Sequence, residues 1–195
     1  MENKELNHEE SLALIQDMIN LAKNKINETG FHFLLWGVLV ILASLTQYFM
    51  IQTNSGYNSN LVWPIMSAIG LPFAFMYERR RSKSGVSNTK FDRIYGFVWL
   101  GFGITLCIAL AICISNHINP IAFILMLVGL ATFVSGTIYR YLPLIIGAIV
   151  FWVSAVIASQ LNGADQLLLN AIAILLGYVI PGLLLWNKSK RENRV

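Results

Sequence analysis

The sequence predicts an all-α, polytopic integral membrane protein with six transmembrane helices preceded by an amphipathic N-terminal helix. Of the 195 residues, 56% are hydrophobic and only 12% are charged, against roughly 25% charged residues in soluble domains. The apolar residues form six long runs, and the basic residues occur only in alternate connections between them. Within lipid, every backbone N–H and C=O group must form its hydrogen bond inside the protein, which only helices and closed barrels allow. The runs lack the alternation of apolar and polar residues that is typical of barrel strands, so helices are expected.

The six runs have about the length of 20 residues that a membrane-spanning helix needs. Residues 115–119 separate the third run from the fourth, and Pro120 fits the first position of a new helix. Gly163 and Asp165 break the fifth run from the sixth. The expected bundle occupies residues 30–187, with spans at 31–51, 61–77, 94–114, 120–138, 142–159 and 166–186.

The distribution of Lys and Arg predicts the orientation of these spans. The chain has 14 such residues, and short basic loops stay in the cytoplasm. They lie before the first span, in 78–93, at Arg140 and in the tail 188–195, whereas the connections 52–60, 115–119 and 160–165 hold none. A multi-pass protein of the bacterial inner (cytoplasmic) membrane is therefore expected, with both termini and the basic tail in the cytoplasm.

The segment 1–29 is expected to be a cytoplasmic amphipathic helix, regular over 8–28. Asn7 is its candidate N-cap, and Asn27 to Gly30 are expected to end it before the first span. Its apolar residues recur at intervals of three and four, which is typical of a helix with one apolar face. The stripe consists of Leu12, Ile15, Ile19, Ala22 and Ile26.

The charge of segment 1–29 bears on its partner. Six acidic residues and three lysines give it a net charge of −3, whereas helices that lie on membrane surfaces are usually basic. It could instead dock on the basic loop 78–93, pair with a second copy of the chain, or recruit a cytoplasmic protein. The basic loop could also contact anionic lipid headgroups. The candidate partner or lipid contacts are Arg79, Arg80, Arg81 and Lys83 in the loop and Ile15, Ile19 and Ile26 on the helix.

Chemical motifs are missing from the sequence. No span carries an acidic or basic residue in its central part, and there is no metal-binding motif, phosphate loop or nucleophile–base set. Neither enzymatic activity nor a cofactor, a metal or a nucleic-acid partner is therefore expected. The nearest grouping, His32, Glu78 and Asp92, is interpreted as solvated interfacial charge. Cys107 and Cys113 are about 9 Å apart along one helix and cannot pair there.

Two prolines interrupt predicted spans. Pro72 and Pro181 each free the carbonyl four residues back, at Ala68 and Gly177, and such sites can kink a helix. They do not fall at matching positions in a three-plus-three repeat. This mismatch argues against an inverted-repeat transporter.

The polar residues within the spans favour helix packing and leave a small-molecule pocket as the alternative. Gln47 and Asn170 are the best individual candidates for such a pocket. Trp152 and Ser135 are weaker ones, for which packing is the favoured interpretation.

Three segments stand out in the sequence: Phe31-His32-Phe33-Leu34-Leu35-Trp36-Gly37, residues 131–138, and Pro143-Leu144-Ile145-Ile146-Gly147 with Phe151-Trp152. Through them the chain resembles a group of uncharacterised six-helix inner-membrane proteins of Bacteroidota-type bacteria. The resemblance implies an inner-membrane location and no particular activity. We expect a non-enzymatic membrane scaffold or regulator acting through its cytoplasmic face. The alternative is a small-molecule binding or transport protein with a pocket between the helices.

Overall fold

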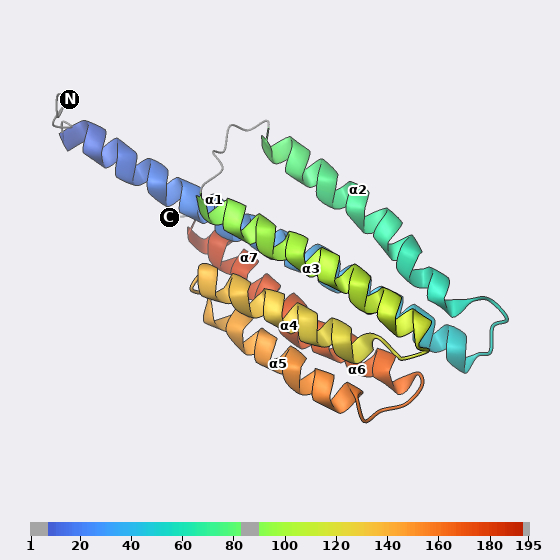
Figure 1. The fold of residues 1–195 in the computed structure, drawn as a ribbon. Helices are drawn as coiled ribbons and strands as arrows, with labels where there is room; N and C mark the ends of the chain where they lie inside the picture. The colour runs from blue at the N-terminus through green and yellow to red at the C-terminus, as the bar shows by residue number, and fades with distance from the viewer. Residues whose placement is uncertain (1–7, 83–89, 193–195) are drawn as a thin grey trace.

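The computed structural model describes the backbone of residues 8–82 and 90–192, and the side chains of 30–80 and 93–186. Every regular element in these ranges is helical, as predicted (Figure 1). The elements are α1 (His8–Gln52), η1 (Ser59–Leu61), α2 (Val62–Ser82), α3 (Lys90–Ser115), α4 (Ile121–Ile138), α5 (Leu142–Ala158), α6 (Asp165–Ile174), η2 (Leu175–Val179) and α7 (Ile180–Glu192).

The predicted break between the N-terminal helix and the first span is wrong. α1 runs unbroken for 45 residues, about 67 Å at 1.5 Å per residue, and its first part projects past the other helices (Figure 1). A single glycine costs a helix only about 1 kcal/mol, and here it serves packing. A Cβ built on Gly30 would stand 3.4 Å from the Gly182 carbonyl oxygen and 3.5 Å from the Trp186 nitrogen. Gly30 therefore lets α1 approach α7. The expected cap, Asn7, lies outside the described residues.

The last span is irregular next to Pro181, one of the two prolines at which the sequence allows a kink. The last span consists of α6, the π-helical turn η2 and α7, and η2 ends just before Ile180 and Pro181. Proline cannot donate a backbone hydrogen bond to the residue four positions back. A wider π turn is one way for a helix to accommodate this missing hydrogen bond. Pro72, in contrast, lies inside α2, which stays α-helical from Val62 to Ser82.

The predicted hairpin connections are present, with small shifts. Residues in the left-handed region turn the chain at His117 (φ 57°), Arg140 (φ 50°) and Gly163 (φ 63°). Pro120, expected at the first helical position, instead occupies the N-cap position of α4, which begins one residue later at Ile121. Asp165, expected within the break before a span that begins at 166, is the first residue of α6.

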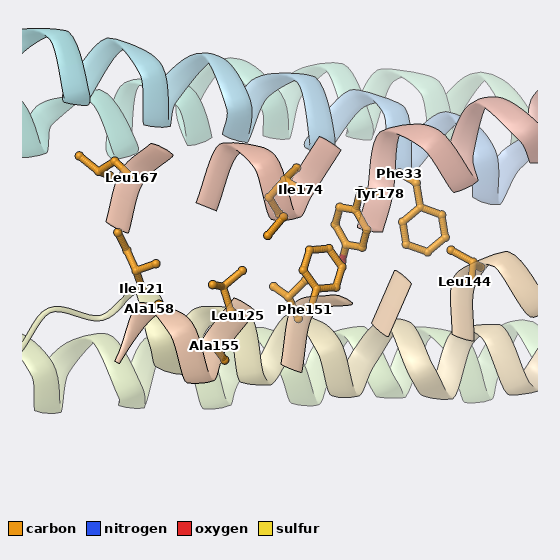
Figure 2. Close-up of a cluster of buried hydrophobic side chains, with 12 residues drawn as sticks. Phe33, Ile121, Leu125, Leu144, Phe151, Ala155, Ala158, Leu167, Ile174 and Tyr178 are labelled. Atoms are coloured by element: carbon orange, nitrogen blue, oxygen red, sulfur yellow. The ribbon is translucent and has the colours of Figure 1, made fainter. Parts of the chain in front are cut away.

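The buried core lies between α1, α6, η2 and α7 on one side and α4 and α5 on the other (Figure 2). Its largest fully buried side chains include Phe33 from α1, Leu125 from α4 and Phe151 from α5. Small residues let these helices approach closely: a Cβ on Gly37 would stand 2.9 Å from Val179, and one on Gly129 would stand 2.6 Å from the Trp152 indole nitrogen.

α2 and α3 lie at the edge of this bundle. In the described part of the chain, the Cα atoms of α2 come within 8 Å only of α1 and η1, and those of α3 only of α4. α2 contacts α1 at Gly70, where an added Cβ would stand 2.8 Å from Leu39 and 3.1 Å from Trp36. The remaining faces of α2 and α3 expose apolar side chains, among them Phe73, Phe75, Phe97, Ile104 and Ile108.

Five helical segments are long and apolar enough to cross a membrane: 30–52, 59–80, 93–115, 121–138 and 165–186. α5 is also apolar, but with 17 residues it reaches only about 25 Å. These segments match the predicted spans closely in position. The chain is thus an all-helical protein with the dimensions of a membrane protein.

Candidate functional site

Gln47, a candidate pocket residue, lies in a hydrogen-bonded group at the Gln52 end of the bundle. It is buried on α1, and its Oε1 accepts a 2.6 Å hydrogen bond from the Trp63 indole nitrogen. Its Nε2 donates to Asn60 Oδ1 at 2.9 Å. The side chains of Gln47, Trp63 and Asn60 thus attach η1 and the start of α2 to α1 through these two hydrogen bonds.

Asn170, the other main candidate, lies one helix further into the bundle. Its side chain is 2% exposed, and its Nδ2 donates to Ser44 Oγ at 2.8 Å, which joins α6 to α1. Its Oδ1 is buried and has no hydrogen-bond partner. One helical turn back, Gln166 donates from Nε2 to the Leu161 carbonyl at 2.6 Å and also leaves a buried Oε1 without a partner.

The two main candidates therefore share one region. Ser44 and Gln47 are three residues apart on α1, and Gln166 and Asn170 are four apart on α6, so each pair lies on one helix face. The region is polar and buried, and two carboxamide oxygens in it can still accept a hydrogen bond. Buried polar atoms are nearly always paired, so these two oxygens mark a place for a donor, either water or a solute.

Sequence reasoning missed Ser44, Asn60, Trp63 and Gln166 as members of this group. The spacing of Ser44 to Gln47 and of Gln166 to Asn170 was a usable signal, because it places polar side chains together on one face. The roles of Asn60 and Trp63 depend on how α2 returns along α1, which no local pattern indicates.

The two weaker candidates lie elsewhere, where they pack. The Trp152 side chain packs against Gly129 of α4. Its indole nitrogen donates to the Met126 carbonyl at 3.3 Å, and its ring centroid lies 5.5 Å from that of Phe133. Ser135 is fully buried, and its hydroxyl donates to the Ala131 carbonyl of its own helix at 2.7 Å. Neither residue joins the group around Asn170.

His32 and Glu78 form a contact at the opposite, Gly30 end of the bundle. His32 Nε2 lies 3.7 Å from Glu78 Oε2, and both side chains retain solvent exposure. Beside them, Phe31 stacks on Tyr77 with ring centroids 3.9 Å apart. These contacts join α1 to α2 at this end. The side chain of Asp92 lies outside the described residues, and within the described ones no three His, Cys, Asp or Glu side chains could hold a metal ion.

The candidate contact residues are only partly described. Arg79 and Arg80 occupy the exposed end of α2. Arg81 and the apolar stripe residues Ile15, Ile19 and Ile26 are placed by their helical backbone alone, and Lys83 lies outside the described residues. The predicted partner and lipid contacts of this surface stay predictions.

No family model, curated protein or solved structure matches the chain.

Proposed function

We propose that the chain is a multi-pass protein of the bacterial inner membrane, with both termini in the cytoplasm, that acts as a non-enzymatic scaffold or regulator. The long apolar helices support membrane insertion. The end of α2, the start of α3, the α4–α5 connection and the end of α7 lie at the same end of the bundle (Figure 1). These segments contain Arg79, Arg93, Arg140 and Lys188. Positive charge gathered at one end supports a cytoplasmic location for that end.

The unbroken α1 helix is the observation that carries this function. The amphipathic stripe of residues 12–26 continues without interruption into the helix that packs against α2, α6, η2 and α7. A partner bound to the stripe would therefore act on the central helix of the bundle. Because the stripe has the heptad-like spacing of pairing helices, we propose that it pairs with another helix, and that a second copy of the chain supplies this helix.

A matched pair of double variants tests the proposal. Ile15→Glu with Ile19→Glu places two charges in the stripe, whereas Gln16→Glu with Asn20→Glu adds the same charge one residue further on. We expect the wild type and the Gln16/Asn20 variant to have the mass of a dimer in detergent by light scattering, and the Ile15/Ile19 variant that of a monomer. An identical mass for all three proteins would refute pairing through the stripe.

The orientation is tested separately. Both natural cysteines are first replaced. Ser55→Cys then places a thiol in the connection 52–60, and Ser84→Cys places one in the connection 78–93, which is predicted to lie on the other side of the membrane. In intact spheroplasts, a membrane-impermeant maleimide is expected to label the cysteine at 55 and to leave the one at 84 unlabelled. The reverse pattern would invert the proposed topology.

Small-molecule binding is a second candidate function, favoured by the unpaired oxygens of Asn170 and Gln166. A solute with two donor hydrogens could satisfy both acceptors. Native mass spectrometry of the purified protein tests this idea: a bound mass present in the wild type and lost in Asn170→Leu is expected. A wild type that carries no bound mass would leave water as the occupant and remove this candidate.

A further inference from the structure

The Gly30 half of the bundle contains two buried hydrogen-bond donors that have no acceptor. They are the indole nitrogen of Trp99 on α3 and the hydroxyl group of Tyr178 in η2. An indole N–H can only donate, and a phenol hydroxyl donates one hydrogen. The Tyr178 side chain is 4% exposed, so bulk solvent does not supply the acceptor.

The nearby hydroxyl groups leave these donors unpaired. Thr132 lies beside Tyr178 and donates its own hydroxyl hydrogen to the Val128 carbonyl at 2.7 Å. The Tyr178 hydroxyl has no hydrogen-bond partner among the described residues. The Trp99 ring lies beside that of Tyr95, with centroids 6.0 Å apart, and the indole nitrogen likewise has no hydrogen-bond partner among the described residues. The two donors thus share one unmet requirement, an oxygen or nitrogen acceptor.

Aromatic rings connect the two donors. The Phe33 ring contacts both side chains, with its centroid 6.2 Å from that of Trp99 and 4.9 Å from that of Tyr178. Phe151 closes the far side, 5.1 Å from Tyr178. Figure 2 shows Tyr178 extending from the last span toward the α4–α5 side, with Phe33 and Phe151 beside it.

This cluster lies next to the boundary between α1 and α3, called the seam below, where only side chains are in contact. In the described part of the chain, no Cα atom of α1 comes within 8 Å of one in α3, so the rings of Phe33 and Trp99 bridge the gap between these helices. In the described part of the chain the Cα atoms of α3 come within 8 Å of α4 alone, and added Cβ atoms on Gly96, Gly101 and Gly103 would meet nothing within 4 Å. A rotation of the Trp99 side chain would therefore open the seam without separating packed backbones.

We propose that the seam between α1 and α3 binds a neutral, planar, lipid-soluble molecule with more than one carbonyl group, such as a quinone, whose carbonyl oxygens accept hydrogen bonds from Trp99 and Tyr178. The donors require an acceptor, and the rings favour a flat partner that stacks on them. None of the cluster residues Phe33, Trp99, Phe151 and Tyr178 is charged, so a buried carboxylate or phosphate would be costly there. The apolar surfaces of α1 and α3 would accommodate a hydrocarbon chain.

Binding of decylubiquinone, a benzoquinone with a decyl chain, tests the site. The full chain is placed in nanodiscs, and probe retained above that in empty nanodiscs is measured as its concentration rises. We expect saturable binding to the wild type. Trp99→Phe and Tyr178→Phe, which keep a ring and remove one donor, should each weaken it about two- to tenfold, the range for one neutral hydrogen bond.

Trp152→Phe is the matched control. It also removes an indole nitrogen, but one already bonded to Met126 on another face of the bundle, and it should leave the affinity unchanged. Decylbenzene, which lacks the carbonyl groups, should bind the wild type and Trp99→Phe equally. Retention that never saturates, or equal quinone affinity in the wild type, Trp99→Phe and Tyr178→Phe, would overturn the proposal.

Thermal unfolding without the probe separates this site from a structural buried water. An unpaired hydroxyl destabilises the empty protein, so Tyr178→Phe should raise the melting temperature or leave it unchanged. If a resident water satisfies the hydroxyl, the same variant should lower the melting temperature, and that result would contradict an empty site awaiting a ligand. Neither measurement involves the N-terminal helix, so its outcome is independent of the proposed scaffold function.

Discussion

Gly147 on α5 lies directly against the backbone of Gly177 in the π turn. A Cβ built on Gly147 would stand 2.5 Å from the Gly177 carbonyl oxygen and 3.1 Å from its Cα. A Cβ on Gly177 would in turn stand 2.5 Å from the Phe151 ring. This carbonyl is the one that Pro181, four residues on, cannot use as a hydrogen-bond acceptor. The closest approach between α5 and the last span therefore falls where the helix ladder is interrupted.

Gly147→Ala is expected to destabilise the protein, because the methyl group meets backbone atoms that cannot rotate away. Overpacking of this kind costs about 1–3 kcal/mol. Gly101→Ala is the matched control, since an added Cβ there meets nothing within 4 Å and alanine favours a helix over glycine by roughly 0.5–1 kcal/mol. Thermal unfolding in detergent should show opposite shifts for the two variants, and a drop of similar size in both would contradict the contact at Gly177.

The helices themselves were predictable from the sequence because their length and apolar character are set locally. The span predicted at 142–159 is α5 from Leu142 to Ala158, and the expected break at Gly163 has the positive φ that glycine favours. The break expected near Gly30 is absent because intrinsic propensities are small beside tertiary packing. The room that Gly30 leaves for α7 is a property of the pair of helices and leaves no local signal.

The candidate site was predictable to a lesser degree. Gln47 and Asn170 attract attention because carboxamides are costly inside apolar spans, and both are buried. Their partners depend on which helices are neighbours, and hydropathy does not determine that order. Trp152 illustrates the same limit: its position over Gly129 follows from the packing of α5 on α4 and not from its place within the span.

The bond between Ser44 and Asn170 should appear as a coupling energy. Ser44→Ala and Asn170→Ala each remove one partner, so the double variant should lose less stability than the sum of the single ones. Hydrogen bonds between membrane helices couple by about 0.6 kcal/mol on average and up to about 1.7, which a denaturant titration of all four proteins can resolve. Thr105→Ala, whose hydroxyl bonds only to Gly101 of its own helix, should add to Asn170→Ala without coupling.

The attachment of α2 to α1 should weaken when the Phe31–Tyr77 stack is removed. Tyr77→Ala deletes a ring whose centroid lies 3.9 Å from that of Phe31 on α1. In the described part of the chain, the Cα atoms of α2 come within 8 Å only of α1 and η1. An aromatic pair is worth about 0.5–1.5 kcal/mol, so amides of α2 should exchange with deuterium roughly two- to tenfold faster. Met76→Ala changes an exposed neighbour and should leave exchange unaltered; equal acceleration in both would show that the stack does not hold α2.

The continuity of α1 predicts a long, fixed distance between its two halves. In a chain with Cys107 and Cys113 replaced by alanine, nitroxide labels at Gln16→Cys and Leu42→Cys are 26 residues apart, about 39 Å along an unbroken helix. We expect a narrow distribution near this value by pulsed electron paramagnetic resonance. Dilution with unlabelled protein removes distances between paired copies.

Glu28→Pro supplies the comparison for this measurement. A proline inside a helix removes one hydrogen bond and clashes with the carbonyl four residues back, so the same label pair should then give a shorter or broader distribution. If the chain with Glu28 already gave such a distribution, the stripe and the bundle would move independently. A partner bound to residues 12–26 would then have no rigid connection through which to act on α1, and the extension would serve only as a tether.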